Sequence, residues 1–178
     1  MLERLRRFVR ENPDCFSPEL QTGHITGAAW IVDLTRRHVL LTHHLKLDKW
    51  LQLGGHAEGE VDPLAIALRE AREESGLTFI RPLSDNIFDV DVHPIPARGN
   101  QPEHFHYDIR YLMEADRELP LRISSESKAL SWVKIDEIHL WSREESIVRM
   151  ASKCLGFFVA TDGAKIYRLK NPKDCWSL

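Results

Sequence analysis

Glu70, Glu73 and Glu74 are three and four residues apart, a spacing that brings their carboxylates to one face of an α-helix. Like charges on such a face repel by about a few tenths of a kcal/mol per pair, so we expect a compensating charge nearby. On an arbitrary helix that charge comes from solvent and from neighbours such as Arg69 and Arg72. The alternative is a divalent cation, because hard ions such as Mg²⁺ bind carboxylate and phosphate oxygens together. The spacing therefore raises the hypothesis of metal-assisted chemistry on a phosphate.

The element that must position these glutamates is a helix predicted over residues 63–75. Asp62 is a favourable N-cap, Pro63 suits the first helical position, and Gly76 is a typical stop signal. A glycine-rich turn over residues 54–60 precedes the helix, so a tight turn runs directly into a carboxylate-bearing helix. The stripe predicted to face the core consists of Leu64, Ala67, Leu68 and Ala71.

The turn and helix together resemble the Nudix box, whose pattern is Gly, five residues, Glu, seven residues, then Arg-Glu-apolar-any-Glu-Glu-any-Gly-apolar. The matching stretch is GGHAEGEVDPLAIALREAREESGL, residues 54–77. Counted from Gly55, the pattern is matched in register by Arg69, Glu70, Ala71, Glu73, Glu74, Gly76 and Leu77. One position departs, because Val61 stands where the pattern has its first Glu. The nearest carboxylate, Glu60, comes one residue early and is a candidate substitute.

The resemblance implies an α/β fold, a Nudix-type α/β/α sandwich with a mixed central sheet. It also implies metal-dependent hydrolysis of a pyrophosphate bond in a nucleoside diphosphate linked to another group, by attack of a metal-activated water. The implied cofactor is Mg²⁺ or Mn²⁺. The implied metal ligands are Gly55 (or its neighbour Gly54), Glu70, Glu73 and Glu74. Arg69 would orient an adjacent glutamate and complete the catalytic set.

Three further candidates lie near the box or in a later loop. The family usually recruits another carboxylate from the loop before the last strand, as general base or metal ligand, and Glu126 occupies that place. Lys49 precedes the glycine-rich turn and His56 lies within it, and both are predicted to bind substrate phosphate. The alternative for all three is an ordinary solvated side chain.

A predicted strand over residues 104–113 adds a polar face. His104, His106 and Asp108 alternate along it, and alternate side chains of a strand share one face. We predict that His104 and His106 bind substrate, in contact with phosphate or metal beside the glutamates. The alternative is the polar outer face of a half-exposed strand.

The rest of the chain predicts a single domain over residues 1–178. We divide it into an N-terminal docking helix and turn over 1–22, a core over 24–155 and a C-terminal extension over 156–178. The predicted docking helix covers 2–11. Predicted strands cover 24–33, 38–44, 77–83, 86–92, 104–113 and 130–135, with a surface loop at 93–103 and a last helix at 142–153.

The composition is that of a soluble globular protein: 178 residues, 43% hydrophobic, with 24 basic and 27 acidic residues and a net charge of −3. This balance excludes collagen-like and coiled-coil classes and predicts no extended nucleic-acid surface. The chain has no apolar run of membrane-spanning length and no signal-peptide core, and Cys15, Cys154 and Cys175 form no paired motif. We therefore expect a cytoplasmic protein, no membrane contact and a small nucleotide-type substrate. The family resemblance adds a homodimer as an expectation.

Two other functions stay open at this point. A Nudix-fold sensor would hold an ADP-ribose-like or nucleotide ligand without turnover, and Val61 supports it. The three helix glutamates and Arg69 count against it, because a pure binder does not need so much like charge on one helix face. A diphosphate isomerase that shares the fold would use a cysteine with a glutamate, and Cys15 is its candidate.

Overall fold

One mixed sheet of eight strands organises the residues described by the computed structural model, 1–99 and 101–159. The strands are β1 (Gly23–Asp33), β2 (His38–His44), β3 (Lys49–Leu51), β4 (Leu53–His56), β5 (Ile80–Pro82), β6 (Asp89–Ile95), β7 (His104–Ala115) and β8 (Ser127–Lys134). The helices are α1 (Leu2–Glu11), α2 (Pro63–Ser75) and α3 (Glu145–Val159), with a 3₁₀ helix η1 (Ile135–Leu140).

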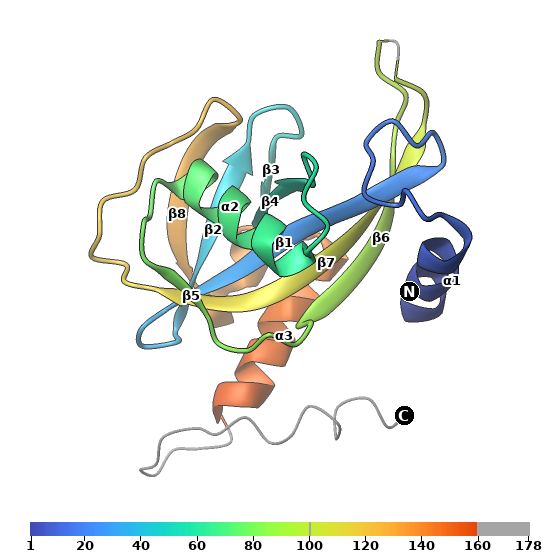
Figure 1. Cartoon of the computed structure of the whole chain (residues 1–178). Coiled ribbons are helices and arrows are strands. Elements are labelled where there is room, and N and C mark those ends of the chain that lie inside the picture. Colours follow the sequence, from blue (N-terminus) through green and yellow to red (C-terminus); the bar gives the residue numbers. More distant parts are fainter. Residues whose placement is uncertain (100, 160–178) are drawn as a thin grey trace.

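The two long strands β1 and β7 form the centre of the sheet (Figure 1). They run parallel and pair over their whole shared length, from Gly23 opposite Phe105 to Asp33 opposite Ala115. All other strand pairs are antiparallel: β2 and β4 pair with β1, β5 and β6 pair with β7, and β3 and β8 pair with β2. The sheet is therefore mixed, as the sequence predicts.

Helices cover both faces of this sheet, which makes the predicted α/β/α sandwich (Figure 1). Successive side chains of β1 point to opposite faces, so the strand contributes to two cores. Ile25 and Ala29 belong to the core under α1 and α2, whereas Trp30 and Val32 belong to the core under α3. Burial on both faces explains why β1 is an almost unbroken apolar run.

Helix α2 begins and ends where the sequence predicts. The Asp62 side chain accepts a hydrogen bond from the Leu64 amide at 3.0 Å, and Gly76 ends the helix in the left-handed region, at φ 71°. Ala67 is fully buried as predicted, and so is Ile66, which the predicted stripe omits. Gly27 of β1 makes room for it, since a Cβ there would stand 2.7 Å from the Ile66 side chain.

Several boundaries differ from the prediction. β6 extends through His93 and Pro94 to Ile95, where the sequence predicts a loop from residue 93, because these residues pair with β7. Pro94 is tolerated because β6 has β7 as its one partner strand. β5 is shorter than predicted, and α3 begins at Glu145 and runs past the predicted core boundary to Val159. Most of the predicted extension, residues 160–178, lies outside the described residues.

Ion pairs with a buried carboxylate attach α3 to the sheet. Asp89 of β6 is buried and accepts hydrogen bonds from Arg149 at 2.6 and 3.2 Å and from Lys153. Arg110 of β7 lies 3.6 Å from the same carboxylate and 3.2 Å from Asp91.

None of the helices in the described ranges combines the length and the apolar character that crossing a membrane requires.

Candidate functional site

A carboxylate-lined cavity of about 240 Å³ lies where α2 meets the turn after β4 and the loop before β8. We call it the glutamate pocket. It is lined by Gly55, His56, Glu58, Glu70, Glu73, Glu74, Ser124 and Glu126. All three helix glutamates of the predicted site, the predicted Gly55 and His56, and the predicted loop carboxylate Glu126 are thus brought together.

Glycine backbone forms the wall against which two of the glutamates pack. The Gly54 amide donates a hydrogen bond to Glu74 Oε2 at 3.0 Å. A Cβ on Gly55 would stand 2.5 to 2.6 Å from the carboxyl carbon and oxygens of Glu70, so any side chain there would displace that carboxylate. The two glycines therefore allow the carboxylates to approach the backbone of β4.

Arg69 joins the carboxylates to the turn. Its Nη1 lies 3.1 Å from both Glu73 Oε2 and Glu58 Oε2, and its Nη2 lies 2.9 Å from Glu70 Oε1. Nη2 also donates a hydrogen bond to the His56 carbonyl at 2.6 Å. The planar, multidentate guanidinium suits this task, because it holds several acceptors in fixed directions.

The pocket carries more negative charge than its own residues neutralise. Burial raises the pKa of Glu74 to about 8, against the lowering effect of the Gly54 hydrogen bond, and neighbouring carboxylates add to the rise. Burial also raises the pKa of Glu70 to about 7, although Arg69 opposes this shift. The carboxylates supply several oxygen ligands, and their negative charges are unfavourable so close together. A hard divalent cation would bind these oxygens and compensate the charge.

Val61, at the position where the box pattern has its first Glu, is exposed, and the neighbouring Glu60 does not take the place of that Glu in the described pocket wall. Val61 is 68% exposed, and the Glu60 carboxylate accepts hydrogen bonds from the Val61 and Asp62 amides at 2.7 and 2.9 Å. Glu60 is thus occupied in the turn, and among the described residues it does not line the pocket. Glu58, which sequence reasoning missed, lines the pocket and pairs with Arg69 instead. Its only sequence signal is a carboxylate within the glycine-rich turn.

Neither His104 nor His106 is among the described residues that line the glutamate pocket, although His106 lies beside His56, which does line it. His104 lines a different cavity of about 350 Å³, between the turn before β1 and the loop before β7, and its Nδ1 lies 2.9 Å from the Pro102 carbonyl. His106 packs 5.1 Å from His56, ring centroid to ring centroid. The strand face is not a half-exposed outer face, because His104 and Asp108 are both buried.

Two histidines that sequence reasoning missed belong to the same region. His24 of β1 stands opposite His106 in the parallel register, and His93 of β6 stands opposite it in the antiparallel one. Burial lowers the pKa of His24 to about 4 and that of His106 to about 3. The Asp108 carboxylate is held beneath them by Thr26 at 2.5 Å and Arg110 at 2.8 Å.

Two further candidates lie elsewhere. The Lys49 ammonium pairs with Glu144 at 2.9 Å, and Lys49 is absent from the part of the pocket wall that the structure describes. Cys15 is buried in the core under α1 and α2, and burial raises the pKa of its thiol. Neither placement favours the role that the sequence suggests for these residues, and the isomerase hypothesis loses its candidate nucleophile.

Solved structures of known proteins share this fold. The NUDIX-family hydrolase of Clostridium perfringens is 26% identical, with a TM-score of 0.59 over 74% of this chain and 95% of that one. An Ap4A hydrolase of C. elegans, in a binary complex, is 16% identical, with a TM-score of 0.62 over 77% and 98%. The NUDIX domain of Shewanella oneidensis NrtR, complexed with ADP ribose, is 13% identical, with a TM-score of 0.55 over 83% and 96%.

Sequence comparison agrees. A probable DHNTP pyrophosphohydrolase of Lactococcus lactis subsp. cremoris is 36% identical over 66 residues, which are 36% of this chain. The matched stretch spans 39% of that curated relative. The sequence model of the NUDIX domain family matches residues 24–152, which are well over half of the chain. This range includes every residue that lines the glutamate pocket. The chain therefore belongs to the NUDIX domain family.

Proposed function

We propose that this protein is a Mg²⁺- or Mn²⁺-dependent hydrolase that cleaves a pyrophosphate bond in a nucleoside diphosphate linked to another group. The observation that carries the proposal is the convergence of five carboxylates, from a helix and two loops, on one cavity with a glycine wall. Glu74 is buried and Glu70 half-buried, and gathering their charges with three exposed carboxylates is unfavourable unless a cation shares the site.

The residues of the pocket divide the work. Glu70, Glu73 and Glu74, with the Gly55 carbonyl, would hold the cation, which when bound neutralises phosphate charge and acidifies a water molecule. Arg69 is a positioning residue, because it fixes the directions of the carboxylates it contacts. Glu126 faces the helix glutamates across the cavity, and we propose it as the general base or as a further ligand.

Three of the residues predicted to bind substrate lie at different distances from the glutamate pocket, so their positions support that role to different degrees. His56 lines the glutamate pocket and is the best placed to contact a phosphate there. His104 lies at a separate cavity, and the Lys49 ammonium is paired with Glu144, so their proposed roles now rest on the sequence alone.

The similar proteins indicate which substrates to test. Their names refer to dihydroneopterin triphosphate, Ap4A and ADP ribose, which share a phosphoanhydride attached to a nucleoside-like group. A panel of these three compounds with nucleoside triphosphates and nucleotide sugars covers the class. Phosphate and nucleotide release would be measured for each compound, with Mg²⁺, with Mn²⁺ and with EDTA.

Glu73→Gln and Glu126→Gln are the informative variants, because each removes a carboxylate charge from the pocket with little change of shape. Glu145→Gln, at the start of α3, is the matched control. We expect metal-dependent turnover that falls at least about 100-fold in Glu73→Gln, falls clearly in Glu126→Gln, and is unchanged in the control. Turnover without metal, or full activity in Glu73→Gln, would contradict the proposal.

A non-hydrolytic ADP-ribose or nucleotide sensor is the second candidate. Val61 supports it, since the residue is exposed at the position where the family pattern has a glutamate. Isothermal titration with the same panel separates the two functions. Tight, metal-dependent binding of one compound with no product after prolonged incubation would establish the sensor and overturn the hydrolase.

A further inference from the structure

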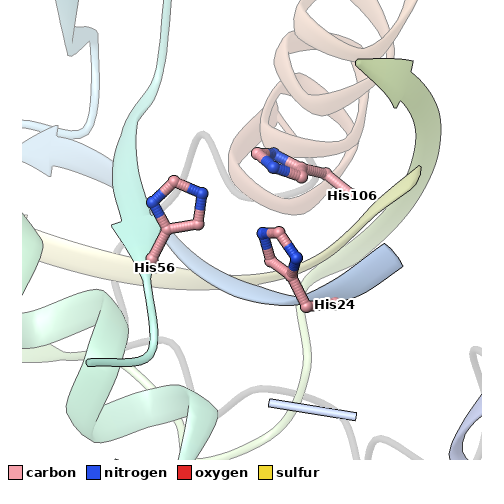
Figure 2. A group of neighbouring side chains, drawn as sticks. All are labelled: His24, His56 and His106. Carbon is pink, nitrogen blue, oxygen red and sulfur yellow. The ribbon is translucent and has the colours of Figure 1, made fainter. Parts of the chain in front are cut away.

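The strand register brings three imidazoles together near the end of the sheet. β1 and β7 place His24 opposite His106, and β1 and β4 place Thr26 opposite His56. One ring nitrogen from each histidine lies within 4.8 Å of the others, and the ring centroids are 4.7 to 5.1 Å apart. Figure 2 shows the three rings grouped around a common space. We call His24, His56 and His106 the histidine cluster.

The cluster contains buried ring nitrogens that have no hydrogen-bond partner among the described residues. His24 is 0% exposed, and neither of its ring nitrogens has a hydrogen-bond partner within residues 1–99 and 101–159. The Nε2 atom of His106 is likewise buried and unpartnered among these residues. Leaving a buried polar group without a partner is unfavourable, so a fold rarely keeps one unless something binds it.

The surroundings favour a cation over a phosphate. Ligand atoms of Asp108, His93 and His106 also lie within 4.8 Å of one another, so a buried carboxylate stands next to the cluster. The Arg110 guanidinium, 2.8 Å from Asp108, compensates part of this negative charge, and the remainder opposes an anion and attracts a cation. Burial favours the neutral imidazole, which offers a lone pair to a metal. The region therefore has the charge and the donor atoms of a metal site.

We propose that His24, His56 and His106 form a second metal site, which binds a divalent transition metal of borderline softness, with Zn²⁺ the best match. Imidazole nitrogen suits such ions, whereas Mg²⁺ prefers the oxygen donors of the glutamate pocket. Tetrahedral zinc with Zn–N bonds of about 2.0 to 2.1 Å needs nitrogens about 3.4 Å apart, so modest ring rotations close the site. His56 is exposed, which leaves a path for the ion and a fourth position for water.

The position of the cluster gives the ion a structural effect. Its ligands come from three different strands, β1, β4 and β7, so one ion would cross-link the centre of the sheet to the start of the glycine-rich turn. The His56 carbonyl accepts the Arg69 hydrogen bond, so the same residue touches both sites. This proposal does not depend on hydrolase activity, and a metal-binding measurement tests it separately.

The test is zinc retention by the full-length protein. EDTA-stripped protein is incubated with Zn²⁺ in a large excess of Mg²⁺, which occupies the glutamate pocket, and is then desalted and analysed for metal. We expect about one zinc ion per chain in the wild type. The same amount is expected in the double variant Glu70→Gln/Glu73→Gln, which disables the glutamate pocket, and in His139→Gln, an exposed control histidine.

His24→Gln and His106→Gln are expected to lose the zinc, and circular dichroism checks that each remains folded. Zinc retained by both folded histidine variants, or lost in the glutamate double variant, would overturn the proposal. X-ray absorption of the zinc-loaded wild type adds a readout that needs no variant. Scattering from about three imidazole ligands is expected, and a shell of oxygen ligands alone would refute the site.

Discussion

The carboxylate of Glu70 lies where a side chain on Gly55 would be, because a Cβ on Gly55 would stand 2.5 Å from the Glu70 carboxyl carbon. Gly55→Ala should therefore displace Glu70 and reduce metal-dependent turnover by about 10-fold or more, with the fold retained. Gly156→Ala is the control, since a Cβ there meets nothing within 4 Å. Steady-state kinetics at several Mg²⁺ concentrations measure the effect, and unchanged kinetics would show that the contact has no role.

Arg69→Lys should weaken the site although it keeps the charge. Lysine has three donors on one compact ammonium and cannot reproduce the planar guanidinium fork that reaches three carboxylates and the His56 carbonyl. We expect kcat to fall about 10-fold or more and the Mg²⁺ concentration for half-maximal activity to rise. Arg72→Lys, on the exposed side of the same helix, should leave both values unchanged. Equal effects of the two substitutions would argue against a positioning role for Arg69.

The raised pKa of Glu74 predicts how the stability of the metal-free protein depends on pH. Between about 4.5 and 8 the unfolded chain has released the Glu74 proton, while the folded protein still holds it. The free energy of unfolding therefore falls as pH rises through this window. Glu74→Gln removes this loss, so at pH 8 in EDTA we expect the variant to be more stable than the wild type by roughly 1 to 4 kcal/mol.

Urea titrations at pH 5 and pH 8 measure that difference. Glu145→Gln, on an exposed helix start, should show the same pH dependence as the wild type. A Glu74→Gln variant that gains nothing at pH 8 would show that the buried carboxyl is not held in its protonated form.

Asp89 should contribute to stability and not to turnover. Its buried carboxylate compensates Arg149 and Lys153 of α3, so Asp89→Asn leaves those cations under-compensated. Arg149 and Lys153 are partly exposed and regain some hydration, so losing this partner is expected to cost about 1 to 3 kcal/mol. Urea unfolding should show this loss, with kcat of the folded fraction unchanged. Asp136→Asn on the surface should cost less than about 0.5 kcal/mol, and a similar small loss for Asp89→Asn would refute the anchoring role.

Local signals are enough to place the helix that carries the glutamates. Asp62 and Pro63 start α2 and Gly76 ends it, and each acts through the backbone of its immediate neighbours. The i, i+3 and i, i+4 spacing then gathers Glu70, Glu73 and Glu74 without any tertiary contact. The family resemblance adds Gly55, Arg69 and Glu126. Gly55 and Glu126 line the same cavity as the glutamates, and Arg69 contacts two of them.

Sequence reasoning does not reveal which carboxylate replaces the missing box glutamate. Glu60 is the nearer candidate along the chain, but its carboxylate accepts the amides of its own turn. Glu58 lies 3.1 Å from Arg69 Nη1, and its backbone adopts φ 51°, a conformation that no local pattern around it predicts. The choice between the two depends on how the turn packs against α2.

The sequence by itself determines the α2 glutamates and the family, because helix caps, helical spacing and the box pattern are properties of neighbouring residues. Only the tertiary structure decides the histidine cluster. His24 and His106 are 82 positions apart and meet because β1 and β7 pair in one parallel register. A shift of one residue would turn the side chains of the shifted strand to the other face. The tertiary structure also buries Glu74 of α2, whose carboxylate accepts the Gly54 amide of β4, and this burial raises the pKa of Glu74.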